Sequence, residues 1–270
     1  MNSTVNSAQD NLLRAEKLSA GYGRNMVLRE ISFSLDRGEL LVLAGPNGAG
    51  KTTLLKSLGG FIRPSAGHVF LEGRNSAELT GRERSRHRSF LFQNQYFSWP
   101  FKVREIVKQG RYPYQGWLGT EKEADREAVR RALADTALDG FEDRPITELS
   151  GGELQRVLIA RSIAQEASLL LLDEPVSHLD PNHQLMIMKL IRGLAGRGTG
   201  VLLTLHDLNL ASLYADRIML LSAGMIAALG APGDVLREDV LRDIFGSSMR
   251  VSSHPDRPSL PMVFPPAPAD

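Results

Sequence analysis

The stretch Gly45-Pro-Asn-Gly-Ala-Gly-Lys-Thr52 limits the possible folds of this chain more than any other. It fits the pattern G-x-x-x-x-G-K-[ST], in which glycines let backbone N–H groups turn inward without an obstructing Cβ. The largely apolar run Glu39–Ala44 before it has the length of a buried strand, and Lys51–Leu58 reads as a helix. Strand, glycine loop and helix in this order predict an α/β core that holds phosphates at a helix N-terminus.

The side chains of this phosphate loop suit a nucleoside triphosphate bound with Mg²⁺. Lys51 is predicted to reach the terminal phosphates, and the Thr52 hydroxyl is predicted to ligate Mg²⁺. The other nucleotide contacts of the loop are assigned to Gly45, Pro46, Asn47, Gly48, Ala49, Gly50 and Thr53. An ordinary glycine-rich loop would need neither the lysine nor the flanking strand and helix.

The composition excludes several classes of protein. The chain has 270 residues with a net charge of +1, whereas nucleic-acid-binding domains are usually strongly basic. It has no cysteine, which rules out disulfides and thiolate metal sites. No stretch approaches the roughly 20 apolar residues of a membrane span, so a membrane role is expected to come through a partner. The polar segment 1–11 lacks the order of a signal peptide and is expected to be a tail.

Strands and helices alternate after the phosphate loop. Leu169–Leu172 and Val201–Leu205 are apolar runs of strand length, and His183–Leu194 between them has helical spacing. This alternation predicts a parallel sheet covered by helices. Leu28–Leu35 alternates like a half-buried strand and, with His68–Leu71, suggests a further β unit.

The predicted fold is an α/β P-loop NTPase core with an antiparallel β subdomain and a helical insert. The main domain is expected at residues 12–246, with the helical subdomain inserted at about 95–160. Residues 1–11 and 247–270 are expected to be tails, the latter because the chain becomes rich in Pro and Ser.

Two carboxylates follow the apolar run Leu169–Leu172. A buried strand would deliver Asp173 and Glu174 to the carboxyl edge of the sheet, where ligands of α/β proteins bind. Asp173 would then hold Mg²⁺ through a water, and Glu174 could polarise an attacking water as a general base. Without the phosphate loop, the pair would read as a solvated acidic turn.

The segment Leu149-Ser-Gly-Gly-Glu-Leu-Gln-Arg156 resembles the signature of the ATP-binding-cassette (ABC) ATPases. A lone Ser-Gly-Gly is usually a helix-capping turn, but the order of phosphate loop, signature and acidic pair is that of this family. The resemblance covers about residues 12–245. It implies ATP hydrolysis in a head-to-tail homodimer, in which Ser150, Gly151 and Gly152 of one chain contact the nucleotide held by the other.

The resemblance assigns four further residues. Tyr22 lies where the family stacks an aromatic ring on adenine, although a strand-edge tyrosine would look the same. Gln93 resembles the glutamine that contacts Mg²⁺ and the attacking water, with Gln95 as a nearby competitor. Asp180 matches an aspartate at the dimer interface. His206 matches the histidine that contacts the γ-phosphate, although a lone histidine after a strand is more often structural.

Short segments outside the motifs above indicate which group of transporters the chain resembles. Val103–Pro113, His206–Ala211 and Gly230–Val235 resemble importer ATPases for iron–siderophore complexes, haem and cobalamin, although Val103–Pro113 could be only an amphipathic helix and turn. The implied partners are two membrane permease subunits and, indirectly, a substrate-binding protein, with no nucleic acid. The implied location is peripheral, on the cytoplasmic face of the inner membrane. Candidate permease anchors are Tyr96, Phe97, Trp99 and Phe101.

An alternative from another class is an ABC ATPase that works without a permease, for example in iron–sulfur assembly. Repair and ribosomal forms usually carry coiled coils, zinc sites or two cassettes, and this chain has one cassette and no cysteine. The insert resembles the importers better than the assembly ATPases.

Overall fold

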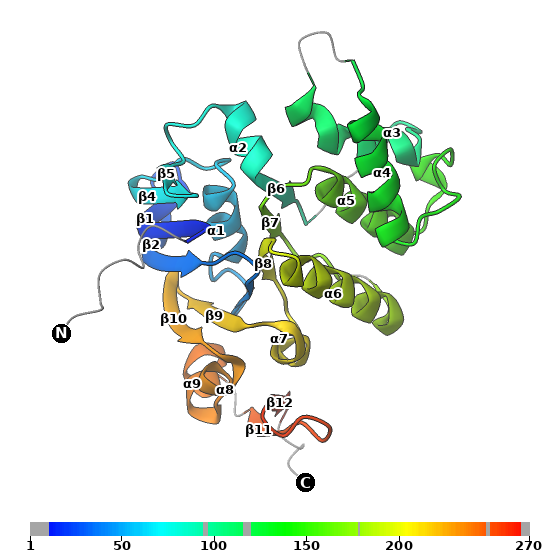
Figure 1. Cartoon of the computed structure of the whole chain (residues 1–270). Helices are drawn as coiled ribbons and strands as arrows, with labels where there is room; N and C mark the ends of the chain where they lie inside the picture. Colours follow the sequence, from blue (N-terminus) through cyan, green and yellow to red (C-terminus); the bar gives the residue numbers. More distant parts are fainter. Residues whose placement is uncertain (1–10, 94–96, 116–119, 178, 247–248, 266–270) are drawn as a thin grey trace, which may run out of the picture.

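The structure is a computed structural model, and it describes residues 11–93, 97–115, 120–177, 179–246 and 249–265. A six-stranded sheet forms its centre (Figure 1), in the order β10-β9-β3-β8-β7-β6. Its strands are β3 (Leu40–Ala44), β6 (Arg88–Leu91), β7 (Leu169–Leu172), β8 (Gly200–Thr204), β9 (Arg217–Ser222) and β10 (Met225–Gly230). All neighbours pair in parallel except β9 and β10, which form an antiparallel hairpin.

The central strands are apolar because both faces of the sheet are covered. Along β7, Leu169 and Leu171 pack into one hydrophobic cluster, and Leu170 and Leu172 pack into the other. Every residue of β3, β7 and β8 is buried. Continuous apolar runs are the expected pattern of parallel strands buried on both faces, and they were the basis of the sheet prediction.

A second, antiparallel sheet packs with helix α1 (Lys51–Leu58) on one face of the central sheet. Its order is β2-β1-β4-β5. Its strands are β1 (Leu13–Tyr22), β2 (Asn25–Leu35), β4 (Ala66–Leu71) and β5 (Arg74–Asn75). The strands predicted at Leu28–Leu35 and His68–Leu71 therefore lie in one antiparallel unit, and both extend further toward their N-termini.

The helical insert projects from the edge of the central sheet that β6 forms (Figure 1). Its elements are α3 (Val103–Lys108), η1 (Gln109–Tyr114), α4 (Glu123–Asp135), η2 (Ile146–Glu148) and α5 (Gly151–Ala164). Helix α2 (Gly81–His87), which the sequence patterns did not predict, precedes β6. It has no buried residue and begins with a capping box between Thr80 and Glu83.

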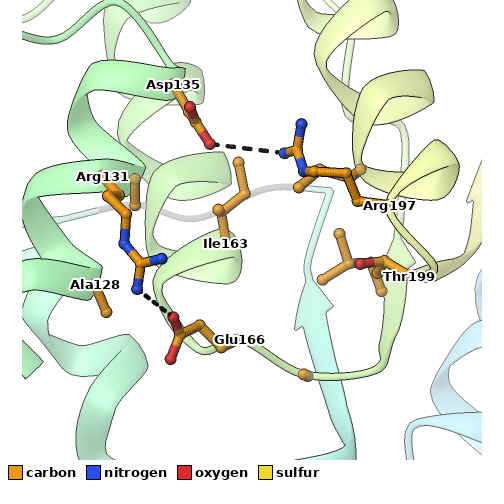
Figure 2. A pocket seen from close by; sticks show the side chains of 11 residues that line it. Ala128, Arg131, Asp135, Ile163, Glu166, Arg197 and Thr199 are labelled. Carbon is orange, nitrogen blue, oxygen red and sulfur yellow. Dashed lines mark hydrogen bonds and ion pairs between the residues drawn. The ribbon is translucent and has the colours of Figure 1, made fainter. Parts of the chain in front are cut away.

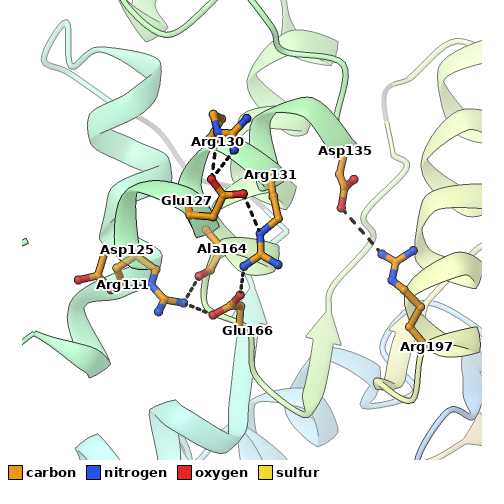
Figure 3. A network of polar contacts seen from close by, with 9 residues as sticks. All are labelled: Arg111, Asp125, Glu127, Arg130, Arg131, Asp135, Ala164, Glu166 and Arg197. Atoms are coloured by element: carbon orange, nitrogen blue, oxygen red, sulfur yellow. Dashed lines mark hydrogen bonds and ion pairs between the residues drawn. The ribbon is translucent and has the colours of Figure 1, made fainter. Parts of the chain in front are cut away.

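Buried charges tie the insert together (Figure 3). The guanidinium of Arg111 bonds Asp125 at 3.0 Å, Glu166 at 2.8 Å and the Ala164 carbonyl at 2.7 Å. Arg111 and Asp125 are both buried, and hydrogen bonds from Lys122 and Arg111 hold the pKa of Asp125 below its usual value against the effect of burial. Because a buried ion pair is costly to break, these contacts fix η1 and α4 onto α5.

The insert meets the core across a cavity of about 450 Å³ (Figure 2). Asp135 at the end of α4 lies 3.8 Å from Arg197, which follows α6 (Pro181–Gly196). This half-exposed ion pair is the bridge that Figure 2 draws between insert and core. A surface pair at that distance adds little stability.

The C-terminal region departs from the expected tail. After α7 (Leu208–Tyr214), α8 (Pro232–Val235) and α9 (Glu238–Phe245), strands β11 (Arg250–Ser253) and β12 (Pro261–Phe264) form an antiparallel hairpin. The Asn209 side chain bonds both the N–H and the C=O of Val263, and the Ser212 hydroxyl donates to the Pro261 carbonyl. These side-chain bonds hold β12 against α7, because a two-stranded hairpin is at best marginally stable alone.

No helix in the described part of the chain is long and apolar enough to cross a membrane.

Candidate active site

The phosphate loop adopts backbone angles that only glycine tolerates well. Gly45, Gly48 and Gly50 have φ values of 142°, 78° and 104°. A Cβ on Gly45 would lie 2.1 Å from the Leu221 carbonyl oxygen of β9, so the loop packs directly on the sheet. A Cβ on Gly48 would meet nothing within 4 Å, which leaves the inner side of the loop open. A glycine loop of this shape is the phosphate cradle that the motif predicts.

Lys51 lies at the first position of α1, beneath this cradle. Its Nζ donates to the carbonyls of Gly45 at 2.7 Å and Pro46 at 3.0 Å. Burial lowers the pKa of Lys51, while the negative charges of Glu174 and Asp173 oppose that shift. The ammonium group is therefore desolvated and bonded to two neutral carbonyls. An anionic ligand would bind it more strongly than these carbonyls do.

Sheet order brings the separate motifs to one edge. The phosphate loop follows β3, His206 follows β8, the acidic pair follows β7, and Gln93 follows β6; these four strands are neighbours and parallel. Because parallel strands end at the same edge, residues more than a hundred positions apart converge there. The Asp173 N–H donates to the Leu91 carbonyl at 3.0 Å, which fixes the end of β7 against that of β6.

Thr204 joins the acidic pair to β8. Its hydroxyl donates to Asp173 Oδ1 at 2.9 Å and accepts the Glu174 N–H at 2.7 Å. Burial raises the pKa of Asp173, and hydrogen bonds from Thr204 and Thr52 partly oppose the rise. A cation bound between this buried carboxylate and the Thr52 hydroxyl would stabilise the charged form of Asp173.

Glu174 is held in an unusual backbone conformation. Its φ is +51°, in the left-handed region that non-glycine residues rarely adopt, and its Oε1 lies 2.7 Å from Nε2 of His206. Strain of this kind persists only where surrounding contacts enforce it, and here Thr204 and His206 do so. The His206 side chain is half-exposed, so this pair faces the space in front of the sheet edge. A carboxylate placed so can accept a proton from a bound water.

The residues present fit Mg²⁺ as part of a nucleotide complex. The described residues hold no group of three or more His, Cys, Asp or Glu side chains that could bind a metal by themselves. Mg²⁺ in nucleotide sites usually takes one or two protein oxygens and completes its shell with phosphates and waters. Thr52 and the buried Asp173 carboxylate offer that limited set.

The signature segment starts α5 and lies at the surface. Ser150 caps the helix by accepting the Glu153 N–H, while Glu153 accepts from the Ser150 N–H and hydroxyl at 2.8 Å. Ser150 and Gly151 are exposed, and a Cβ on Gly151 would meet nothing within 4 Å. Within the described ranges, no hydrogen bond or ion pair links residues 150–152 to the phosphate loop of the same chain.

The remaining predicted residues are placed as follows. Tyr22 ends β1 and is 51% exposed, which is compatible with stacking on a ligand. Gln93 is half-buried, two residues after β6. Asp180 caps α6 through the N–H groups of Asn182 and His183, and a side-chain bond to His183 lowers its pKa. The competitor Gln95 and the proposed anchor Tyr96 fall outside the described residues.

Two residues that contact the acidic pair or the residue after it were not predicted from the sequence. Thr204 was read as part of an apolar strand, although a single hydroxyl inside that run was a visible signal. Gln155 donates from α5 to the Pro175 carbonyl at 2.9 Å, directly after the acidic pair. No pattern in the sequence points to that contact, because it joins the insert to the core.

Known proteins match this chain over nearly its full length. The sequence fits the family described as ABC transporter over residues 28–177. A hemin import ATP-binding protein of Rhizobium meliloti is 43% identical over 262 residues, 94% of this chain and 98% of the relative. A probable siderophore transport system ATP-binding protein of Bacillus subtilis is 39% identical over 244 residues, 90% of this chain and 89% of the relative.

The chain belongs to the ABC transporter family.

Solved structures agree with this assignment of the ABC fold. A transporter assigned to the metal-chelate type, in an inward-facing conformation, superposes with a TM-score of 0.83 and 28% identity, covering 96% of this chain and 98% of the other. A dimeric bacterial ABC transporter cassette gives a TM-score of 0.72 with 27% identity, covering 81% and 98%. The predicted fold class is thereby confirmed, and this ABC chain is an ATPase.

Proposed function

We propose that the chain is the ATP-hydrolysing motor subunit of a membrane importer for an iron chelate, either haem or a siderophore complex, or for cobalamin. The observation that carries this proposal is the sheet edge at which Asp173, Glu174 and His206 meet, in a chain that matches import and transport ATP-binding proteins over almost their whole length. The solved metal-chelate transporter of the same fold supports it further. An ABC ATPase without a permease is less well supported, because the two relatives described above are named as a hemin import and a siderophore transport ATP-binding protein.

In the proposed reaction, Glu174 is the general base and His206 holds its carboxylate in place. The 2.7 Å contact between them orients Oε1, and Thr204 holds the Glu174 backbone from the other side. Lys51 carries positive charge to the terminal phosphates, and its carbonyl partners keep it positioned until they arrive. Gln93 would contact the attacking water.

Mg²⁺ would be held by Thr52 and Asp173, with Gln93 nearby. When bound, the ion neutralises phosphate charge and so favours attack by water. Tyr22 and the loop residues 45–53 would bind ATP.

The active unit would be a head-to-tail homodimer with two ATP molecules. Ser150 and Gly151 are exposed and separated from their own phosphate loop, so they are free to contact a second copy. The N-terminus of the 14-residue helix α5 favours an anion at that position. Asp180 would lie at the same interface. The dimeric cassette of similar fold supports this arrangement.

Two permease subunits would complete the importer, placing the chain on the cytoplasmic face of the inner membrane and bringing it indirectly to a substrate-binding protein. Of the proposed anchors, Trp99 is 71% and Phe101 is 42% exposed, so both can reach a partner. Phe97 packs against the core cluster and is a poor anchor.

Growth and uptake in a deletion strain test the cargo. The strain is supplied in parallel with haem, ferric siderophores and cobalamin as the limiting nutrient, and complemented with either the wild-type chain or Glu174→Gln. Loss of uptake of one of these chelates, restored only by the wild-type chain, is expected. Unchanged uptake of all three would contradict the importer assignment.

A further inference from the structure

The turn between β9 and β10, Ala223-Gly224, lies between the phosphate loop and the antiparallel sheet. The Gly224 N–H donates to the Ala49 carbonyl of the phosphate loop at 3.2 Å, and the Gly224 carbonyl accepts the Arg29 N–H of β2 at 2.9 Å. Figure 1 shows β2 and β10 side by side. A single residue therefore joins the loop to an edge strand of the other sheet.

This approach is too close for any side chain at position 224. A Cβ on Gly224 would overlap the Val27 carbonyl oxygen and lie 2.9 Å from the Val27 carbonyl carbon, so the backbone would have to move. Gly224 is buried with a φ of 77°, and the exposed Ala223 before it has a φ of 48°. A two-residue hairpin with positive φ at both positions usually carries Asn-Gly or Gly-Gly. Alanine in this conformation is strained, so contacts around the turn hold its shape.

The phosphate loop is fixed to the core independently of β2. A Cβ on Gly45 would overlap the Leu221 carbonyl oxygen of β9, and Lys51 bonds two carbonyls of the loop from the largely buried helix α1. By contrast, β2 is an edge strand of the smaller sheet and pairs with β1. A group inserted between the loop and β2 would therefore displace β2 more than the loop.

A shift of β2 would reach Tyr22. Tyr22 pairs with Asn25 at the end of the β1–β2 hairpin, and Asn25 lies two residues before Val27. This end of the hairpin is closely packed, because a Cβ on Gly21 would overlap the Asn25 carbonyl oxygen. Displacement of the backbone at Val27 would therefore carry the Tyr22 ring with it.

We infer that Gly224 is a positioning residue, which sets the spacing between an adenine subsite at Tyr22 and the phosphate subsite at the loop. The inference rests on the proposed function, because that function places adenine on Tyr22. A nucleotide spans both subsites, so its affinity depends on their separation, whereas pyrophosphate occupies the phosphate subsite alone. Glycine allows this separation because it has no Cβ between the two backbones.

Binding of ADP and of pyrophosphate to the full-length chain, measured by calorimetry with Mg²⁺ present, tests the spacing. Gly224→Ala is expected to weaken ADP binding about 10-fold, the size of one lost aromatic–base stack, and to change pyrophosphate affinity less than about 2-fold. Gly140→Ala is the matched control, since Gly140 has a φ of 81° and a Cβ there would meet nothing within 4 Å. It carries a similar backbone cost without the overlap, and it should bind both ligands like the wild-type chain.

A double-mutant cycle separates positioning from a general loss of structure. Tyr22→Ala should weaken ADP binding to a similar extent, and adding Gly224→Ala to it should cause little further loss, because both changes remove the same contact. In steady-state assays of Gly224→Ala, KM for ATP should rise about 10-fold while kcat stays within about 3-fold, because Glu174 and His206 keep their places. Additive losses in the cycle would overturn the inference.

Amide exchange in the wild-type chain provides a second measurement, which needs no change at Gly224. By joining the two subsites, ADP should slow exchange of the Arg29 N–H that bonds Gly224, and pyrophosphate should not. Equal protection by both ligands would count against the inference even if Gly224→Ala failed to fold.

The binding assay also distinguishes failure of this inference from failure of the proposed adenine contact. Equal loss of ADP and pyrophosphate affinity in Gly224→Ala would show that the turn only builds the phosphate loop, and unchanged ADP affinity would show that the spacing has no effect. Either result overturns the inference and leaves the adenine contact intact. If Tyr22→Ala alone leaves ADP affinity unchanged, the adenine contact itself is wrong and the inference fails with it.

Discussion

Thr204→Val is the most informative small change in the site. Valine keeps the shape of threonine and removes only the hydroxyl that bonds Asp173 at 2.9 Å and the Glu174 N–H at 2.7 Å. Thr204 and Asp173 are buried, so water cannot easily replace these bonds. One bond is charge-assisted and one is neutral, and their loss should lower the free energy of unfolding by about 2–4 kcal/mol.

The same variant should slow catalysis. Without the hydroxyl, the backbone of Glu174 loses the bond that holds it at φ +51°, and the base moves away from its working position. We expect kcat to fall roughly 10- to 100-fold, with a small change in KM for ATP, because the nucleotide contacts remain.

Urea unfolding and steady-state ATPase assays measure both effects. Thr199→Val is the matched control, since Thr199 precedes the same strand and makes no side-chain hydrogen bond with the described residues; it should change stability by about 0.5 kcal/mol or less. A Thr204→Val variant as stable and as active as the control would refute the argument that this hydroxyl organises the acidic pair.

Three further predictions concern neighbouring contacts. Asp173→Asn should abolish ATPase activity yet raise the unfolding free energy of the nucleotide-free chain at pH 7.5, because burial raises the pKa of Asp173 and so penalises its charged form. The penalty is absent below the unfolded pKa of about 3.9, so urea titrations should show the gain shrinking as pH falls; a pH-independent gain would contradict this cause. Glu174→Gln should retain ATP affinity, measured with a fluorescent nucleotide, while turnover falls about 100-fold or more, and undiminished turnover would exclude Glu174 as the base. Asn209→Ala should free the C-terminal hairpin by removing both bonds to Val263, about 1–2 kcal/mol, seen as faster amide exchange in residues 250–264; unchanged exchange would show that the hairpin is held by other contacts.

Much of the fold could be read from the sequence, because its central elements are defined locally. Lys51–Leu58 and Leu169–Leu172 have the predicted ends, since a glycine loop starts the helix and a run of leucines bounded by charge defines the strand. Helix α2 was missed because it buries nothing, and only its capping box between Thr80 and Glu83 marks it.

Contacts between distant segments could not be predicted in this way. The C-terminal hairpin depends on Asn209 and Ser212, about fifty residues earlier, so its Pro- and Ser-rich sequence resembled a tail. The phosphate loop and the acidic pair, which the structure brings to one sheet edge, each have a short pattern of their own. Thr204 and Gln155 have none, since their roles arise only when strands and insert come together.

The central claim is that each ATP site is built from two copies of the chain, and mixing two inactive variants tests it directly. Lys51→Ala disables the phosphate loop and keeps the signature. Gly151→Glu disables the signature, and the fold should tolerate it because a Cβ there meets nothing within 4 Å.

Each variant alone should be inactive. In a mixed dimer, the intact loop of one chain meets the intact signature of the other, so an equal mixture should recover about a quarter of wild-type ATPase activity. A mixture as inactive as its components would contradict the shared site.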